Sequence, residues 1–211
     1  MDTLSKDTLF QLALDLEVPD LLRLCMTSRK LNTYICSRNE IWLEKLKQFP
    51  NYETIPGMSL KDIYILNLLK SKLFYKGTIS ELYSAKLLIS DHLKFIPREI
   101  GFLQNLERLC MSYGDIKAIP REIGNLQNLR LLNLTDNNIK EIPIEVLKLK
   151  NLERLDISNN PIEQIPKELK QLTKLKELDL YKTNVNVRKI PKEIKNIKGL
   201  RIIIPSGHLF K

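Results

Sequence analysis

Cysteine, histidine and tryptophan are scarce in this sequence. Its 211 residues include three cysteines, two histidines and one tryptophan. Cys25, Cys36 and Cys110 are odd in number and widely spaced, which fits neither a disulfide framework nor a zinc site. His92 and His208 lie far apart in the sequence and adjoin no cysteine or serine motif, so no catalytic constellation is predicted. We therefore expect a protein that is no enzyme and that has no metal and no cofactor.

Long apolar runs and a leader sequence are also missing. The aliphatic run at 202–204 is far shorter than the about 20 apolar residues of a membrane span. The first ten residues, MDTLSKDTLF, carry two aspartates and no basic flank, unlike a signal peptide. An apolar content of 43% fits a globular protein. We expect a cytoplasmic or nuclear protein, in the host cytoplasm if the source is a virus, with no membrane partner.

The sequence does contain an internal repeat, between residues 105 and 198. Three copies have 23 residues and the fourth has 25: NLERLCMSYGDIKAIPREIGNLQ, NLRLLNLTDNNIKEIPIEVLKLK, NLERLDISNNPIEQIPKELKQLT and KLKELDLYKTNVNVRKIPKEIKNIK. A fixed period of this size is typical of a solenoid, in which each copy buries its apolar face against its neighbours.

The apolar spacing within a copy predicts its local structure. Leu132 and Leu134 stand two apart, as in a strand, whereas Val146 and Leu149 stand three apart, as in a helix. Each copy should therefore be a short strand, a turn and a helical return. A proline precedes a glutamate by two residues at the start of every return, which suits a first helical turn. These prolines are Pro97, Pro120, Pro143, Pro166 and Pro191.

The pattern LxxLxLxxNxIxxIPxxIxxLxxL resembles the leucine-rich repeat of the 23-residue, intracellular kind. The resemblance covers roughly residues 83 to 204 and implies an α/β fold, a short leucine-rich-repeat solenoid with a parallel sheet on its concave side. It also implies that an asparagine at the ninth position bonds the loop backbone of neighbouring copies. Asn137 and Asn160 occupy that position, but Gly114 and Thr183 replace it in the outer copies, where we expect looser turns.

Residues 4–46 are a different kind of sequence, with apolar residues at helical spacing. We expect one amphipathic helix ending near Val18, a second capped by Asp20, and a third over about 28–35, with Trp42 near Leu46. Three short helices bury little core, so some apolar surface should stay available for a partner.

This stretch resembles the F-box, whose pattern is roughly LPxELxxxILxxLxxxDLxxLxxVSKxWxxLxxxxxLWKxL. The matching positions are Leu4, Asp7, Leu9, Leu12, Leu16, Asp20, Leu21, Leu24, Ser28, Arg29, Ile35 and Trp42. The sequence departs from the pattern at Ser5 and Leu31, and its loop at 18–20 is one residue short. The resemblance implies docking on a Skp-type adaptor and, through it, on a cullin complex. The residues implied in adaptor binding are Leu4, Leu9, Leu12, Leu16, Pro19, Leu21 and Leu22. The alternative is a helical cap that covers the first repeat.

Three parts are predicted: a small all-α F-box-like domain over 1–50, a linking helix segment over 51–81, and a solenoid of about five repeats plus a terminal strand over 82–211. Ser59 with Asp62 should cap the linking helix, and Gly77 should end it. Apolar residues share one face of this helix: Ile63, Leu66, Leu69 and Leu73. Residues 82–104 should form an irregular opening repeat whose apolar positions include Leu87 and Ile89, with a turn one residue short. Pro205 should stop the last strand.

Strand residues that point away from the core should line the concave side in rows and bind a target protein. We predict as target-binding residues Arg108, Tyr113, Asn133, Asp136, Arg154, Asp156, Asp179 and Tyr181. Tyrosine and arginine are typical of protein interfaces. The alternative is that these rows are merely solvated. The lysines that raise the net charge to +9 fall mostly on the returns among glutamates, so nucleic-acid binding is not expected.

Two functions of different classes follow. The first is the substrate-recognition subunit of an SCF-type ubiquitin ligase, in which the F-box recruits the adaptor and the repeats recruit a target. The second is a leucine-rich-repeat scaffold or effector, with a helical head that is only a cap and no link to ubiquitin. A basic solenoid that binds RNA is a third and weaker hypothesis, which the salt dependence of binding would test.

Overall fold

A computed structural model describes residues 39–49, 51–204 and 209–210. The three helices predicted before residue 36 and all seven predicted adaptor-binding residues lie outside the described residues. Two compact units divide the chain, residues 1–68 and 69–211. This division falls within helix α5, whereas the predicted boundaries follow residues 50 and 81.

In the first unit, helix α4 (Asn39–Leu46) supplies Trp42, whose side chain is fully buried. Its ring centroid lies 5.7 Å from that of Tyr64, which belongs to helix α5 (Leu60–Lys72). Ser59 caps α5 as predicted, because the Asp62 backbone N–H donates to Ser59 Oγ at 3.2 Å and Ser59 Oγ donates to Asp62 Oδ2 at 2.8 Å. The predicted apolar face of this helix is also buried: Ile63, Leu66, Leu69 and Leu73.

The predicted end of this helix at Gly77 is wrong. α5 ends at Lys72, and Phe74 follows in the left-handed backbone region with φ 51°. A further helix, α6 (Ile79–Ser84), begins with a capping box in which Glu81 N–H donates to Thr78 Oγ1 and Thr78 N–H donates to Glu81 Oε2. The predicted start of the solenoid at residue 82 therefore lies inside a helix.

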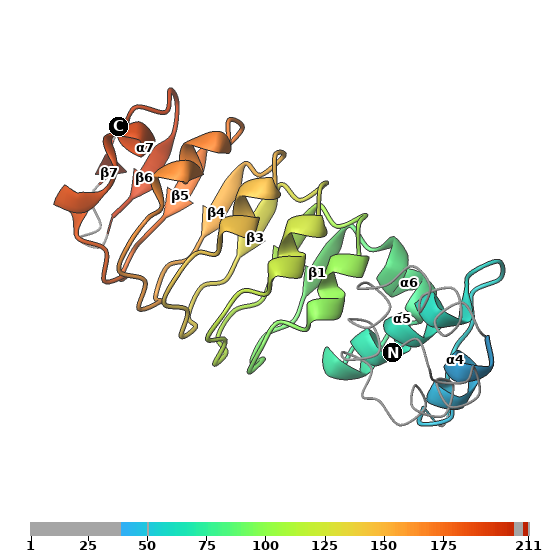
Figure 1. The fold of residues 1–211 in the computed structure, drawn as a ribbon. Helices are drawn as coiled ribbons and strands as arrows, with labels where there is room; N and C mark the ends of the chain where they lie inside the picture. Colours follow the sequence, from blue (N-terminus) through green and yellow to red (C-terminus); the bar gives the residue numbers. More distant parts are fainter. Residues whose placement is uncertain (1–38, 50, 205–208, 211) are drawn as a thin grey trace, which may run out of the picture. The chain divides into compact units, whose positions relative to one another are not determined.

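The second unit contains a sheet with strand order β1-β2-β3-β4-β5-β6-β7. Its first six strands pair in parallel, so the predicted leucine-rich-repeat solenoid with a parallel sheet is confirmed (Figure 1). These strands are β1 (Leu87–Ile89), β2 (Arg108–Cys110), β3 (Leu131–Asn133), β4 (Arg154–Asp156), β5 (Glu177–Asp179) and β6 (Arg201–Ile203). The middle residue of each strand is buried, and Leu109, Leu132, Leu155 and Leu178 are fully inaccessible.

The last predicted strand is not the edge of the sheet. β6 ends at Ile203, before Pro205, but a short strand β7 (Leu209–Phe210) pairs with it in antiparallel orientation. Because β7 pairs with β6, the backbone groups on that side of β6 are less available to a neighbouring molecule. The strand at this edge of the sheet is then only two residues long, and short edge strands limit sheet-to-sheet association.

The helical returns line the side of the solenoid opposite the strands (Figure 1). Most of them are 3₁₀ helices: η2 (Arg98–Phe102), η3 (Arg121–Asn125), η4 (Ile144–Lys148) and η5 (Lys167–Gln171). Only the last, α7 (Lys192–Lys195), is an α-helix, and η6 (Val187–Lys189) lies within the longer fourth copy. Each glutamate lies in the first turn as predicted, but each proline is the extended residue before the helix, not its first residue. Each 3₁₀ return from η2 to η5 is five residues long and contains i→i+3 hydrogen bonds, such as the one from Ile123 N–H to Pro120 O.

The opening repeat is shifted by one residue from the predicted register. Leu88 pairs with Leu109 and is buried, whereas Leu87 and Ile89 are 45% and 60% exposed. The cause is a shorter turn than predicted. The hydrogen bonds between the first two strands continue to His92, whose N–H donates to Ser112 O at 3.1 Å. The adjacent residue, Leu93, already belongs to the loop, where its carbonyl accepts from Asp115 N–H at 2.8 Å.

The asparagine ladder has the predicted form. Asn137 Oδ1 accepts from Ile116 N–H at 3.1 Å, and Asn137 Nδ2 donates to Met111 O at 2.9 Å, both in the preceding copy. Asn160 bonds Leu134 and Ile139 in the same way.

The turn at Gly114, expected to be looser, is tightly packed. A Cβ atom there would lie 2.3 Å from Leu93 O, so the short opening turn leaves no room for a side chain. Gly114 N–H also donates to Asp136 O at 3.0 Å. At the other end, Thr183 Oγ1 donates to Leu180 O within its own copy.

Candidate functional site

The two residues that flank the buried residue of each strand point to the open side of the sheet. The strand register aligns them in two rows, which we call, together with the loop residues that follow the strands, the concave face. The first row is Leu87, Arg108, Leu131, Arg154, Glu177 and Arg201. The second row is Ile89, Cys110, Asn133, Asp156, Asp179 and Ile203.

The structure brings all eight predicted target-binding residues to this face. Arg108, Asn133, Arg154, Asp156 and Asp179 belong to the two strand rows. The other three lie in the loops that follow the strands: Tyr113, Asp136 and Tyr181. Their role in binding stays a prediction.

One loop residue per copy adopts a left-handed backbone conformation, with φ between 51° and 61°. These residues are His92, Tyr113, Asp136, Asn159 and Lys182. Histidine, asparagine and aspartate tolerate this conformation better than tyrosine and lysine do. Two tyrosines of these loops are exposed, Tyr113 by 62% and Tyr181 by 38%. Lys182 Nζ lies 5.3 Å from the ring centroid of Tyr181. The loops thus present aromatic side chains beside the polar strand rows.

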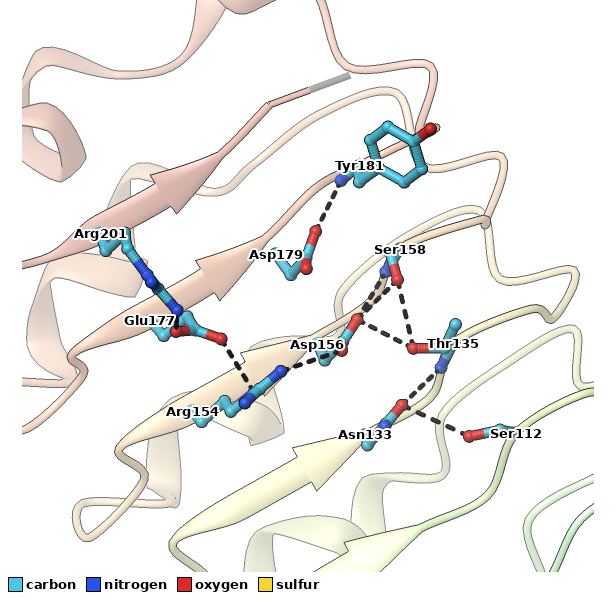
Figure 2. A network of polar contacts seen from close by, with 10 residues as sticks. All are labelled: Ser112, Asn133, Thr135, Arg154, Asp156, Ser158, Glu177, Asp179, Tyr181 and Arg201. Carbon is cyan, nitrogen blue, oxygen red and sulfur yellow. Dashed lines mark hydrogen bonds and ion pairs between the residues drawn. The ribbon is translucent and has the colours of Figure 1, made fainter. Parts of the chain in front are cut away.

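Asp156 lies at the centre of a polar network on this face (Figure 2). Its Oδ1 accepts hydrogen bonds from Ser158 Oγ at 2.7 Å, Thr135 Oγ1 at 2.9 Å and Ser158 N–H at 3.2 Å. Asn133 plays a similar part, because its Oδ1 accepts from Thr135 N–H at 2.9 Å. Asp156 is buried. These side chains hold the loops after β3 and β4, and Asp156 presents little of its surface to a ligand.

Ion pairs connect the first strand row. Arg154 Nε lies 3.0 Å from Glu177 Oε1, an Arg154 terminal nitrogen lies 3.7 Å from Asp156 Oδ2, and Arg201 pairs with the other oxygen of Glu177 (Figure 2). Partly exposed pairs of this kind contribute little to stability. Removing Arg154 would nevertheless leave the nearly buried Asp156 carboxylate without its cation and Glu177 with Arg201 alone, so Arg154 is a poor probe of binding alone.

Asp179 is a half-buried carboxylate of this face. Burial raises its pKa above the ordinary value of 3.8, the hydrogen bond from Tyr181 N–H opposes this shift, and the neighbouring Asp156 and Glu177 charges add to it. A carboxylate with a raised pKa destabilises the folded state when it is ionised, because the unfolded chain ionises it more readily.

Asp179→Asn should therefore raise the melting temperature at neutral pH. The asparagine Oδ1 can still accept the Tyr181 N–H bond, and the repulsion from Asp156 disappears. The sign follows from linkage: the ionised group costs stability as pH rises above 3.8, and the cost fades at lower pH, where wild-type Asp179 is protonated. Thermal melts of both proteins at pH 7 and pH 3.5 check this. A larger gain at the lower pH would contradict it.

Cys110 is the cysteine of the second strand row. Burial raises the pKa of its thiol above 9.0, with Arg108 lowering it and Asp91 raising it. A thiol in this state is a poor nucleophile. Within residues 39–49, 51–204 and 209–210, no three histidine, cysteine, aspartate or glutamate residues come together to hold a metal ion. No helix in the described part of the chain has the length and apolar content needed to cross a bilayer.

Leu87 and Ile89 also belong to this face, although their apolar character led us to predict them as core residues of the opening repeat. The sequence left this open, because the run Leu87-Leu88-Ile89-Ser90 allows either Leu88 or its two neighbours to face the core. Arg201 was also missed, although it follows the fourth copy at the position of Glu177.

A solenoid with an open parallel sheet is the architecture of a repeat protein, whose extended surface is typical of partner binding. The family model for the leucine-rich repeat region matches residues 90–206, which is more than half of the chain. The chain belongs to the leucine-rich repeat proteins. No curated protein matches it.

Solved structures with the same fold come from bacteria and plants. Internalin C2 from Listeria monocytogenes is 24% identical over 58% of this chain, with a TM-score of 0.49. The plant peptide hormone receptor RGFR1, in complex with RGF2, is 28% identical over 58% of this chain, with a TM-score of 0.52. The ectodomain of the Arabidopsis thaliana receptor kinase GASSHO1/SCHENGEN3, in complex with CASPARIAN STRIP INTEGRITY FACTOR 2, is 27% identical over 60%, with a TM-score of 0.51. This chain spans 52%, 20% and 16% of those chains.

Proposed function

We propose that the concave face binds a target protein and that the N-terminal region presents this target to an SCF-type ubiquitin ligase. The leucine-rich repeats are a protein-protein interaction domain. The observation that carries the target-binding proposal is the open strand face itself, flanked by the exposed Tyr113 and Tyr181. Large aromatic side chains next to a polar surface are typical of binding hot spots. The two plant receptors named above were solved in complex with their ligands, which agrees with recognition by such a domain.

Tyr113→Ala and Tyr181→Ala should each weaken target binding by upwards of about tenfold, the size of a hot-spot truncation. Both side chains are exposed, so neither change should shift the melting temperature much. The measurement is affinity capture of the target by the full chain, followed by titration of the captured protein.

The matched controls are Lys170→Glu and Lys195→Glu on the returns, which should alter little beyond a salt-dependent association rate. If these lysine variants eliminated binding while the tyrosine variants bound normally, the basic returns would be the working surface. An acidic or nucleic-acid partner would then account for the binding better, and binding would fall steeply with salt.

The link to ubiquitin is supported by the F-box resemblance of residues 4–46. In this proposal the protein is no enzyme: it docks on a Skp-type adaptor and cullin complex, in the cytoplasm or nucleus, and other subunits transfer ubiquitin to the target. If the source is a virus, the host cytoplasm is the proposed location. The alternative is a scaffold or effector in which the N-terminal region only caps the repeats.

The double variant Leu21→Asp with Leu22→Asp should abolish capture of a purified Skp-type adaptor. A carboxylate buried at an interface without a partner costs several kcal/mol of binding. Target capture by the concave face should persist, and the far-UV circular dichroism melt should retain the transition of the repeats. Equal adaptor capture by both proteins, or none by the wild type, would favour the scaffold hypothesis.

A further inference from the structure

The concave face changes character along the solenoid. Its first strand presents two exposed aliphatic side chains, Leu87 and Ile89, whereas β4 and β5 present charged residues in the same rows. The adjacent strand places Arg108 beside Leu87 and Cys110 beside Ile89. We call these four residues the apolar corner. Exposed aliphatic side chains grouped in this way favour a docking surface over a solvated one.

Arg108 differs from the other arginines of its row. Arg154 and Arg201 both pair with Glu177. Of the carboxylates that the structure describes, none forms an ion pair with Arg108. Its two neighbours in the row are the apolar residues Leu87 and Leu131. A partner that covered the apolar corner would take this guanidinium out of water, which is costly unless the partner supplies a negative charge.

We propose that the target, bound as argued above, contributes an extended segment in which a large apolar residue packs on Leu87 and Ile89 and an acidic residue pairs with Arg108. This inference rests on the proposed function and specifies the chemistry of the bound segment. Adjacent strands lie about 4.8 Å apart, and same-side residues of an extended segment about 7 Å apart. The acidic residue should therefore stand two positions from the apolar one.

The surrounding charges favour a protein segment over a nucleic acid. Asp156 and Asp179 continue the row of Cys110, and Asp91 Oδ1 accepts from the backbone N–H of Ser112 beside it. These carboxylates would repel a phosphate backbone, whereas a single glutamate or aspartate side chain can reach Arg108 alone. Arginine also pairs with carboxylates through two parallel hydrogen bonds, which adds selectivity.

Selection of short linear peptides from a random displayed library on the full chain tests the inference. The selected peptides should carry Asp or Glu two positions from Leu, Ile, Phe or Met. Arg108→Glu should bind them more than about tenfold less tightly, and should bind versions in which Lys replaces the acidic residue. The double variant Leu87→Ser with Ile89→Ser should bind neither version. Arg98→Glu, at an exposed arginine on a return, is the matched control and should bind as the wild type does.

The remaining outcomes overturn the inference in distinguishable ways. Peptides without an acidic residue, which bind Arg108→Glu normally but lose affinity for Tyr181→Ala, would leave the concave-face function intact and remove the apolar corner from it. Peptides insensitive to all these changes would remove both. No enrichment over an unrelated protein would overturn the segment model. A dimer in sedimentation velocity that Ile89→Ser dissociates would assign the corner to a second copy of the chain.

Discussion

Leu132→Ala is expected to lower the free energy of unfolding of the repeat region by about 2 to 5 kcal/mol. Leu132 is the middle residue of β3, pairs with Leu109 and Leu155, and is fully buried. Its truncation removes apolar contacts and leaves a cavity between the sheet and the returns, which neighbouring side chains fill only in part. Each copy gains its stability from its neighbours, so the loss should spread through the array.

Leu131→Ala is the matched control, because Leu131 precedes Leu132 in the same strand but faces the open side and is only half-buried. Urea unfolding followed by far-UV circular dichroism should show a clearly smaller change for Leu131→Ala than for Leu132→Ala. An equal or larger effect of Leu131→Ala would mean that the assigned strand register is off by one residue.

The regular copies could be predicted from sequence because a single period places every core residue. The spacing of Leu132, Leu134, Val146 and Leu149 predicted a strand and a return, and all four are buried. Periodicity did not predict that the returns are 3₁₀ helices. The three-residue spacing of Val146 and Leu149 fits both helix types.

The opening repeat was mispredicted because its neighbours, not its own composition, decide its register. Leu87, Leu88 and Ile89 are equally apolar, so composition cannot tell which of them is core. Pairing with β2 selects Leu88, which lies opposite the buried Leu109, and in this register Leu93 O accepts from Asp115 N–H. The prediction of the candidate site therefore left out Leu87 and Ile89. Their position on the concave face follows only from the pairing of β1 with β2.

A second set of asparagines was also missed, although the first three copies begin with asparagine. Each donates from Nδ2 to a carbonyl of the preceding segment: Asn105 to Tyr83 at 3.2 Å, Asn128 to Gln104 at 3.0 Å, and Asn151 to Gln127 at 2.8 Å. The recurrence at the period was the available signal. This signal is weak by itself, because asparagine is common next to turns of many kinds and can bond its own backbone there.

Asn137→Ala is expected to destabilise the repeat region by about 1 to 3 kcal/mol, the cost of leaving buried backbone groups unpaired. The Asn137 side chain is buried. Its Nδ2 donates to Leu134 O at 3.1 Å and Thr135 O at 3.2 Å, in addition to Met111 O. Alanine supplies none of these bonds, so the preceding copy loses its hydrogen bonds with the side chain at this position.

The next residue in the chain is the matched control. Asn138 is exposed, and its side chain bonds that of Asp115 on the surface, so Asn138→Ala should cost much less. Asn137→Asp separates the two halves of the interaction. Its carboxylate can still accept from Ile116 N–H, but it cannot donate to the carbonyls of Met111 and Leu134, and its charge would face them without a partner.

Amide hydrogen exchange locates the effect. Asn137→Ala should speed exchange at Ile116 N–H, which donates to Asn137 Oδ1 in the wild type, more than at Ile139 N–H, which donates to Asn160 Oδ1 in the next copy. Asn137→Asp should preserve more of the protection at Ile116 while still losing global stability. If both variants melted like the wild type and Ile116 stayed protected, the asparagine would not hold neighbouring copies together, and their stability would come from the leucine core alone.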